Sequence, residues 1–251
     1  PVIKQLEIPL KRDQSKTLVS LMHANNETGA MIDLAQVAHI CRENNALFHS
    51  DTVQTIGYFP LNAGQLGLNF LSGSAHKFHG PKGIGFVYIN NDNQLSPYID
   101  GGAQERNMRA GTENIHGIVG MAKALEIAVQ NMDENHRHII QLKEALVHGL
   151  QQIQPRLKIV GSNQGPSHYK VLNVLFPPDK KTDLILMNLD IHGISVSGGS
   201  ACSSGADAGS HVMEAIGVEP GWNTIRFSFS KLNKMEDVDR VLSEIRQIIH
   251  S

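Results

Sequence analysis

Short apolar runs alternate with an amphipathic helix near the start of this chain. Residues 17–22 (TLVSLM) form an apolar, β-rich run that ends in the polar, turn-prone segment 23–29. Asp33, a favoured N-cap, precedes apolar residues at a three-to-four-residue spacing, which predicts a helix over about 34–43. Residues 46–51 predict a second buried strand that ends at a carboxylate. This order predicts a βαβ unit and a parallel sheet, with binding loops at the carboxyl ends of the strands.

The rest of the chain divides into further strands, loops and helices. We expect strands at 69–72, 84–89, 170–176 and 224–228, and a strand from Gly193 that enters a loop of small residues. Glycine-rich loops are expected at 73–83 and 101–112. Helical patterns cover 115–127, 139–153, 182–189, 211–216 and 238–249.

A polar junction at 131–135 lies between the two longest helical patterns, and we expect a domain boundary there. The prediction is an α/β fold with two domains. Residues 1–132 would form a large domain with a mainly parallel sheet, and residues 133–251 a C-terminal α+β small domain.

Charge and composition restrict the classes of partner. The 22 basic and 24 acidic residues give no electrostatic reason to expect nucleic acid or an anionic membrane as a partner. No apolar run approaches the roughly 20 residues that cross a bilayer, and the first residues have no secretory signal pattern. The two cysteines, Cys41 and Cys202, are too few for a disulfide scaffold and fit a reducing compartment. We expect a cytoplasmic protein.

Lys77 lies in the glycine-rich loop 73–83, and Asp51 ends the neighbouring predicted strand 46–51, followed three residues later by Gln54. A lone lysine is usually a solvated charge. A strand-terminal aspartate combined with a lysine in a loop after a later strand suits a pyridoxal phosphate site. The lysine would hold the cofactor as an imine, and the carboxylate would keep the pyridine nitrogen protonated.

Ser74 and His76 are hydrogen-bond donors in the same loop and could hold the cofactor phosphate. The competing interpretation is a metal site at His76 and His79. Two histidines without a carboxylate or thiolate at ligand spacing do not complete a zinc site, so we predict no metal.

The two cysteines have different surroundings. Cys41 falls on the apolar face of the helix 34–43, where a small buried hydrophobe is expected. Cys202 lies among Gly, Ser and Ala in the segment 197–205 (SGGSACSSG). A polar loop of small residues exposes a thiol and lets it move, which a transferable sulfur requires.

Arg226 alternates with Ile225 and Phe227 in the strand 224–228, so its side chain lies on the opposite face. Strand arginines are usually rim charges, but the planar guanidinium also suits a substrate carboxylate. Asn26, at the tip of the first strand, would share that task or touch the cofactor. The alternative is an ordinary turn asparagine.

Six segments in register resemble the motifs of the cysteine desulfurases, which belong to the aminotransferase class V group of fold-type I pyridoxal phosphate enzymes. They are HANNETG (23–29), HSDTVQ (49–54), SGSAHKFHGPKGIG (72–85), MRAGT (108–112), SGGSACSSG (197–205) and IRFS (225–228). The short SACSS loop resembles the housekeeping iron–sulfur and nitrogen-fixation branch. The resemblance implies a partial PLP-transferase-like large domain and a small domain with a mobile cysteine loop.

The resemblance also implies the roles of residues around the cofactor. Lys77 would form the covalent link to pyridoxal 5'-phosphate, Asp51 would pair with the pyridinium nitrogen, and Gln54 would bond the ring hydroxyl. Ser74 and His76 would bind the phosphate.

Other implied roles concern the substrate and a second subunit. Arg226 with Asn26 would hold the carboxylate of L-cysteine, and Asn26 would also touch the cofactor. Thr112 would reach the phosphate of the partner subunit's cofactor, which implies a homodimer. Cys202 would be the nucleophile that takes the sulfur.

The implied activity converts L-cysteine to L-alanine with a persulfide on Cys202, whose sulfur passes to an acceptor or scaffold protein for iron–sulfur cluster or related biosynthesis. One alternative is a cofactor-free fragment that acts only as a binding module. Another is a lyase or aminotransferase for a different amino acid, such as selenocysteine. Ordinary transamination needs no mobile thiol, so Cys202 argues against it.

The sequence departs from the family at its start. Family members have a long N-terminal stretch before the NNE motif, with a helix start for the phosphate and a histidine that stacks on the ring. Here 25 residues precede Asn26. We therefore expect the C-terminal part of a desulfurase that binds the cofactor weakly or not at all by itself, because the phosphate lacks its helix N-terminus.

Overall fold

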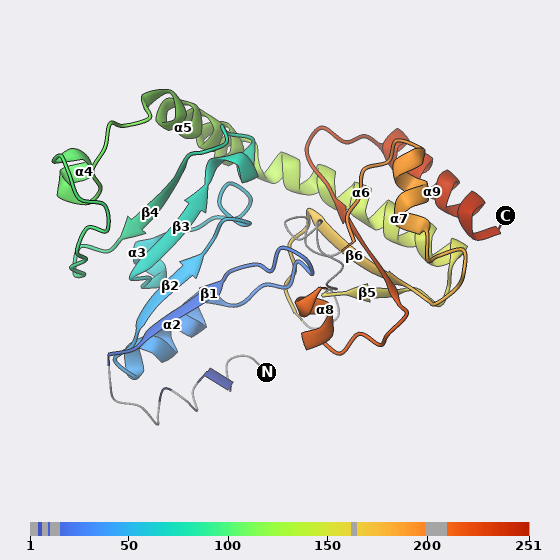
Figure 1. Cartoon of the computed structure of the whole chain (residues 1–251), viewed down its shortest axis with the longest axis horizontal. Helices are drawn as coiled ribbons and strands as arrows, with labels where there is room; N and C mark the ends of the chain where they lie inside the picture. The colour runs from blue at the N-terminus through green and yellow to red at the C-terminus, as the bar shows by residue number, and fades with distance from the viewer. Residues whose placement is uncertain (1–4, 7–9, 11–15, 162–164, 199–209, 251) are drawn as a thin grey trace. The chain divides into compact units, whose positions relative to one another are not determined.

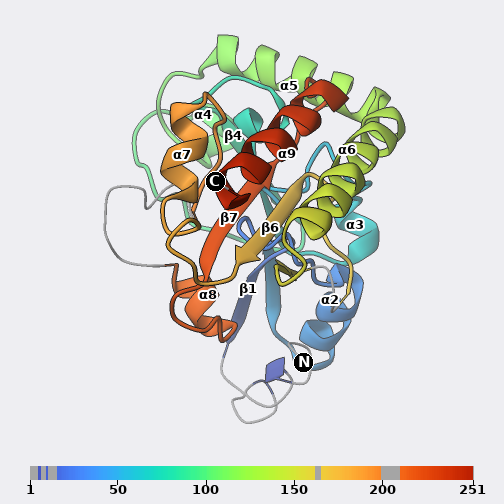
Figure 2. The same ribbon diagram turned by 90° about the vertical axis from the view of Figure 1, so that its right-hand side faces the viewer.

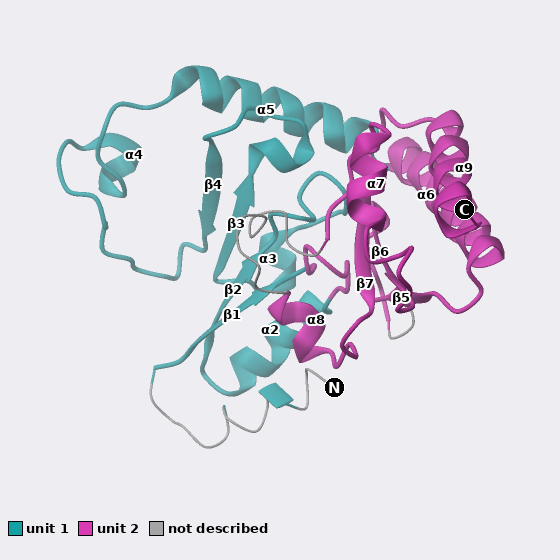
Figure 3. Ribbon diagram, turned by 45° about the vertical axis from the view of Figure 1, so that its right-hand side comes forward, with its two compact units in different colours: residues 1–23, 32–132 teal, residues 24–31, 133–251 magenta. Residues whose placement is uncertain are grey.

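The computed structural model describes residues 5–6, 10, 16–161, 165–198 and 210–250. The chain forms two compact units (Figure 3), one of residues 1–23 and 32–132, the other of residues 24–31 and 133–251. Residues 24–31, which the sequence analysis assigned to the first domain, therefore group with the second unit. The functional roles assigned to the two domains remain predictions.

The first unit contains a four-stranded sheet in the order β1-β2-β3-β4 (Figure 1), formed by Leu18–Met22, Leu47–Asp51, Phe70–Ser74 and Gly85–Ile89. The first two pairings are parallel and the third is antiparallel. This arrangement confirms the predicted α/β fold with a mainly parallel sheet. The register sets Met22 opposite Asp51 and Asp51 opposite Ser72. The carboxyl ends of β1, β2 and β3 therefore lie at the same edge of the sheet.

Helix α2 (Leu34–Glu43) has the predicted bounds because both of its signals are local. The Asp33 side chain accepts a hydrogen bond of 3.0 Å from the Gln36 N–H and caps the first turn. Its apolar face packs with β2 and β3 in one core cluster that includes Val37, Phe48 and Leu71. The core fixes the position of β2 and β3, whose ends carry the candidate site.

The remaining elements of the first unit are short apart from one helix. They are α3 (Ala63–Leu66), the 3₁₀ helix η1 (Ala75–Phe78), α4 (Gln104–Asn107) and α5 (Ile115–Gln130). Neither α3 nor η1 was predicted. Within α4, Glu105 and Arg106 have positive φ values of 49° and 55°, so this segment is not a regular helix.

The second unit contains a three-stranded antiparallel sheet in the order β5-β6-β7, formed by Lys158–Val160, Val171–Phe176 and Asn223–Ser228. Helices α6 (Met132–Ile153) and α9 (Met235–His250) lie side by side over this sheet (Figure 2). A Cβ atom at Gly149 would clash with Leu242, so the glycine permits the close approach of α6 and α9. The short helices α7 (Ile185–Ile191) and α8 (His211–Ala215) complete the unit.

Three local predictions for the second unit need correction. Strand β5 was not predicted, and α7 begins at Ile185 instead of residue 182 because the buried Thr182 hydroxyl donates to the Pro177 carbonyl at 2.8 Å. The strand expected from Gly193 is reduced to a single bridge between Ser197 and Arg226. In the described part of the chain, no helix is both long and apolar enough to cross a membrane.

Candidate functional site

Asp51 is the last residue of β2 and is half-buried. Its Oδ1 accepts a hydrogen bond of 2.9 Å from the Val53 N–H. This bond holds the carboxylate against the turn that follows the strand. The next residue, Thr52, donates to the Ser72 carbonyl through both its N–H (3.1 Å) and its hydroxyl (2.8 Å). Asp51 is therefore held at the carboxyl end of β2, next to β3. Gln54 lies in the same turn with its side chain buried.

Ser74 ends β3, and His76 follows in η1. Ser74 Oγ and His76 Nδ1 are 2.9 Å apart, which is a hydrogen-bond distance. The structure brings these two predicted phosphate ligands together. Their assignment to a phosphate remains a prediction.

Lys77 lies in η1 with a half-buried side chain. Its backbone carbonyl accepts a hydrogen bond of 2.9 Å from the Tyr58 hydroxyl. Burial raises the pKa of Tyr58 to about 12, so this hydroxyl keeps its proton at neutral pH and remains a donor. Glycine is required at position 80, because a Cβ there would lie 2.9 Å from the Ala75 carbonyl oxygen. These contacts fix the backbone that presents the lysine.

The donor set at the ends of β2 and β3 fits pyridoxal phosphate in its chemistry. Asp51 and Gln54 supply a carboxylate and an amide, and Ser74, His76 and Lys77 supply a hydroxyl, an imidazole and an amine. A phosphate takes hydrogen-bond donors, a pyridine nitrogen takes a carboxylate, and an aldehyde takes a primary amine. All five residues belong to the first unit and come from two neighbouring strand ends and the turns after them.

Thr112 is exposed in the segment between α4 and α5. That segment is ordered locally by the Gly111 N–H, which donates to Gln104 Oε1 at 3.1 Å.

The two predicted substrate-binding residues both belong to the second unit and are in contact. Arg226, half-buried on β7, donates from Nη1 to the backbone carbonyl of Asn26 at 2.9 Å. Ile225 and Phe227 are buried on the opposite face of the strand, as the alternation predicted. The contact uses the main chain of Asn26, whereas the sequence analysis assigned a role to its side chain.

Of the two cysteines, the structure describes Cys41. Cys202 lies outside the described residues. Cys41 is buried in the core of the first unit, and burial raises its pKa to about 11, so its thiol stays protonated at neutral pH.

His23 is a buried polar residue that the sequence analysis did not single out. Its Nδ1 lies 2.9 Å from Thr55 Oγ1, and its ring meets Phe59 edge-on at 6.4 Å between centroids. Burial lowers the pKa of His23 to about 4, against a smaller opposing effect of Asp33. The contact with Thr55 ties the end of β1 to the turn after β2. No local sequence pattern marks this pair.

We predict that His23 makes stability depend on pH. Between pH 6.5 and about 4 the unfolded chain binds a proton at His23 that the folded chain does not. Stability from this group is therefore complete above pH 6.5 and is lost as the pH falls toward 4, by up to about 3 kcal/mol. Urea unfolding at pH 7 and pH 4.5 measures this effect. Between the two pH values, His23→Gln should lose less free energy of unfolding than wild type does. His211 is exposed, so His211→Gln should lose as much free energy of unfolding as wild type. If His23→Gln also lost as much as wild type, His23 would not be the group that causes the pH dependence.

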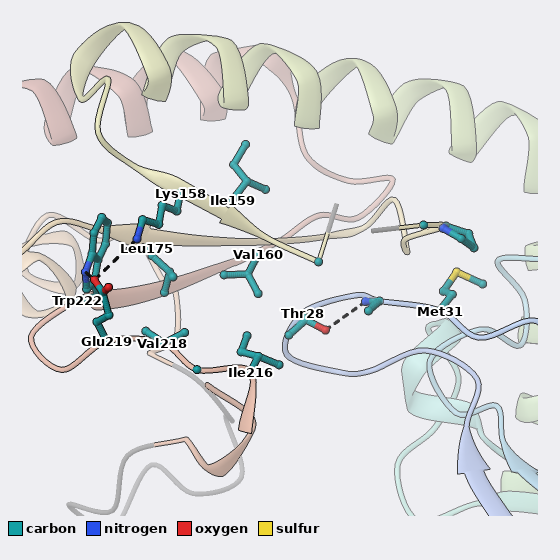
Figure 4. A pocket seen from close by; sticks show the side chains of 15 residues that line it. Thr28, Met31, Lys158, Ile159, Val160, Leu175, Ile216, Val218, Glu219 and Trp222 are labelled. Carbon is teal, nitrogen blue, oxygen red and sulfur yellow. Dashed lines mark hydrogen bonds and ion pairs between the residues drawn. The ribbon is translucent and has the colours of Figure 1, made fainter. Parts of the chain in front are cut away.

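A cavity of about 460 Å³ lies within the second unit (Figure 4). Lys158, Glu219 and Trp222 gather at one end, where Lys158 Nζ lies 4.1 Å from the centre of the Trp222 ring. Thr28 and Met31 line another part of the cavity wall. None of the predicted site residues is among the described residues that line it.

Comparison with known proteins supplies the family. The cysteine desulfurase IscS of Dictyoglomus turgidum is 40% identical over 235 residues, which cover 92% of this chain and 59% of that protein. The cysteine desulfurase IscS of Methanosarcina thermophila is 41% identical over 234 residues, with coverages of 92% and 57%. The solved structure of a NifS-like protein from Rickettsia africae superposes with a TM-score of 0.89 at 32% identity, covering 99% of this chain and 66% of that one.

The chain thus spans less than three fifths of the length of these two curated relatives. The family model for aminotransferase class-V matches residues 3–241, nearly the whole chain. Fold, motif order and sequence similarity agree, and the chain belongs to the aminotransferase class-V family.

Proposed function

We propose that this chain takes part in pyridoxal-phosphate-dependent cysteine desulfuration, in which L-cysteine becomes L-alanine and the sulfur passes to an acceptor protein. The observation that carries the proposal is the donor set of Asp51, Ser74, His76 and Lys77 at two neighbouring strand ends. The names of the relatives support the reaction and favour an enzyme over a cofactor-free binding module.

The residues of the first unit would act on the cofactor. When bound, the cofactor supplies an electron sink that stabilises negative charge at the substrate Cα. Lys77 Nζ would hold it covalently and, once released, carry the Cα proton. Asp51 would keep a negative charge beside the pyridine nitrogen, and the Ser74 and His76 side chains would donate to the phosphate. The hydrogen bond from Tyr58 to the Lys77 carbonyl would keep the lysine in place during these steps.

The residues of the second unit would act on the substrate. Arg226 keeps its charge at any physiological pH, and its fork suits the cysteine carboxylate, which Asn26 would help to position. The Cys202 thiolate would attack the substrate sulfur. The new bond joins the two sulfur atoms, the substrate carbon–sulfur bond breaks, and its electron pair stays on the carbon. Protonation of that carbon gives alanine, and Cys202 keeps the sulfur as a persulfide.

Product analysis tests this proposal. The chain is incubated with excess pyridoxal phosphate, L-cysteine and a thiol reductant, and alanine and sulfide are measured together. Equal amounts of both products are expected. A keto acid without sulfide would favour transamination, and selenocysteine as the better substrate would favour the selenocysteine alternative. No product at any cofactor concentration would remove the activity from this chain.

We further propose a cytoplasmic setting and a protein acceptor for the sulfur. The cysteine content supports the setting, because the chain has only two cysteines and Cys202 has to remain a free thiol. The acceptor proposal rests on the chemistry, since a persulfide needs a second thiolate to receive its sulfur.

The proposed homodimer finds support in the surface of α5. Helix α5 packs on η1, and its Gly120 approaches Pro81 in the loop after η1, but only Gly117 of its 16 residues is buried. Ile115 and Val119, one turn apart, are 64% and 62% exposed. Tyr98 and Ile99, in the segment before α4, are also exposed. Exposed large apolar side chains of this kind are typical of a surface that a second copy covers.

We predict that Ile115→Glu combined with Val119→Glu shifts the chain from dimer to monomer, because each copy would bring two charges into a surface that the dimer buries. Sedimentation velocity over a range of concentrations measures the change. Gln130→Glu, which adds one negative charge at the exposed end of the same helix, is the control and should remain dimeric. A wild-type monomer at all concentrations, or a dimeric double variant, would contradict the proposed interface.

A further inference from the structure

One polar side chain interrupts the apolar strand β6. The strand reads VLNVLF, all six of its residues are buried, and Asn173 is 0% exposed. Its Nδ2 donates to the Glu27 carbonyl at 3.2 Å. Because only the amide nitrogen can donate to a carbonyl, this contact also determines which way the amide points. The Oδ1 atom is buried and, within the described residues, has no hydrogen-bond partner.

A buried acceptor without a partner lowers stability, because the atom has lost its water and gained no hydrogen bond in return. An apolar residue at position 173 would continue the pattern of the strand and would avoid this cost. The stability of the sheet therefore does not explain the asparagine. Departures of this kind from a local pattern are expected at functional positions, so the contact with Glu27 calls for a functional reason.

Asn173 lies directly beside Arg226. The register of β6 and β7 sets the two residues opposite each other. Arg226 exchanges both of its backbone hydrogen bonds with Ser197, on the other side of β7, at 2.7 and 3.3 Å. Asn173 and Arg226 therefore form a non-hydrogen-bonded pair, the kind in which opposite side chains lie closest together on the same face of the sheet.

The two side chains hold consecutive residues of the segment 24–31. Arg226 donates from Nη1 to the Asn26 carbonyl at 2.9 Å, and Asn173 donates to the carbonyl of the next residue, Glu27. All four residues belong to the second unit. The backbone of Asn26 and Glu27 is thus fixed to the sheet by two neighbouring donors.

Further polar contacts set the shape of this segment. Asn25 Oδ1 accepts hydrogen bonds of 2.9 Å from both the Glu27 and Thr28 N–H groups, which forms a turn. The Glu27 side chain is 1% exposed, and its Oε2 accepts a hydrogen bond of 2.5 Å from the Ser210 hydroxyl. Asn173 connects this turn to the central strand of the sheet.

We propose that Asn173 is a positioning residue for recognition of the substrate carboxylate. It holds the Glu27 carbonyl, keeps the backbone of Asn26 and Glu27 against the sheet, and so keeps the Asn26 carbonyl where it receives the Arg226 guanidinium. That Arg226 and Asn26 bind the carboxylate of L-cysteine rests on the proposed function. The position of Arg226 can be tested without cofactor or substrate.

Asn173→Val tests the proposal, because valine suits a buried strand and removes both the donor and the acceptor without a partner. Hydrogen exchange of the backbone amides of 24–31, followed by mass spectrometry, should become about fivefold faster, the change in local opening expected from the loss of one hydrogen bond. Modification of Arg226 by phenylglyoxal should become at least about twofold faster. The urea midpoint should stay near the wild-type value, since removal of the buried acceptor offsets the lost bond. If Asn173→Val does not fold, Asn173→Ala provides the same measurements.

Substrate kinetics separate positioning from a general effect on the fold. Asn173→Val should raise the KM for L-cysteine about fivefold and change kcat less than about twofold, because the carboxylate is held equally in the ground state and the transition state. A merely structural role would reduce the amount of active protein, which lowers the apparent kcat and leaves KM unchanged.

Thr182→Val is the matched control. Thr182 is a buried polar residue of the same unit, and its hydroxyl donates to the Pro177 carbonyl at 2.8 Å, so the variant loses a buried hydrogen bond elsewhere. It should leave the exchange of 24–31, the modification of Arg226 and the KM unchanged.

Three results would overturn the proposal. They are wild-type rates of exchange and Arg226 modification in the Asn173 variants, equal increases in Thr182→Val, and an unchanged KM in an active Asn173→Val. If wild type forms no product, the proposed desulfurase activity fails for this chain. The exchange and modification rates would then still decide whether Asn173 positions Arg226.

Discussion

Replacing Lys77 with alanine should abolish covalent attachment of pyridoxal phosphate and lower alanine formation at least about 100-fold, because the same amine would hold the cofactor and move the Cα proton. Lys77 is half-buried in η1, and the Tyr58 hydroxyl holds its carbonyl at 2.9 Å. Borohydride reduction followed by intact mass measurement tests attachment directly. Wild type should gain one cofactor, and peptide mapping should place it on Lys77.

Lys82→Ala is the matched control for this experiment. Lys82 is exposed and lies in the same loop, five residues beyond Lys77, so its removal changes the charge of the loop without removing the attachment point. It should retain both attachment and alanine formation. Titration over a wide range of cofactor concentrations also measures the affinity. Attachment to Lys77→Ala at the wild-type level would exclude Lys77 as the linking residue.

The parts of the fold that were predicted from sequence are those with local signals. The bounds of α2 follow from the Asp33 cap and the apolar spacing after it. The antiparallel pairing of β4 with β3 was missed, although Ser74 and Gly85 pair across a connection too short for the usual helical crossover. The assignment of residues 24–31 to the second unit depends on contacts with Asn173 and Arg226, which lie far away in the sequence.

The candidate site shows the same division. The Asp51, Ser74, His76 and Lys77 side chains were predicted from strand ends and glycine-rich loops. Tyr58 and Glu27 were missed because their partners lie elsewhere: the Tyr58 hydroxyl reaches Lys77, 19 residues away, and Glu27 meets Ser210, 183 residues away. A tyrosine in a turn or a glutamate in a polar segment carries no sign of such a partner until the chain is folded.

Replacing Cys202 with serine should stop sulfide release while cofactor attachment to Lys77 continues. A serine hydroxyl is not ionised at neutral pH, so it cannot supply the nucleophile that a thiolate supplies, and we expect sulfide and alanine formation to fall at least about 100-fold. Sulfide is measured with a thiol reductant present. In its absence, the wild-type peptide that contains Cys202 should gain the mass of one sulfur atom.

Cys41→Ala controls for the general loss of a thiol. Cys41 is buried, and its pKa of about 11 leaves almost no thiolate at neutral pH, so this variant should keep sulfide release and the persulfide on Cys202. If Cys202→Ser and Cys41→Ala released sulfide equally, Cys202 would not be the nucleophile that takes the sulfur from the substrate. The run of small residues around Cys202 in the sequence would then need another explanation, while the attachment of the cofactor at Lys77 would be unaffected.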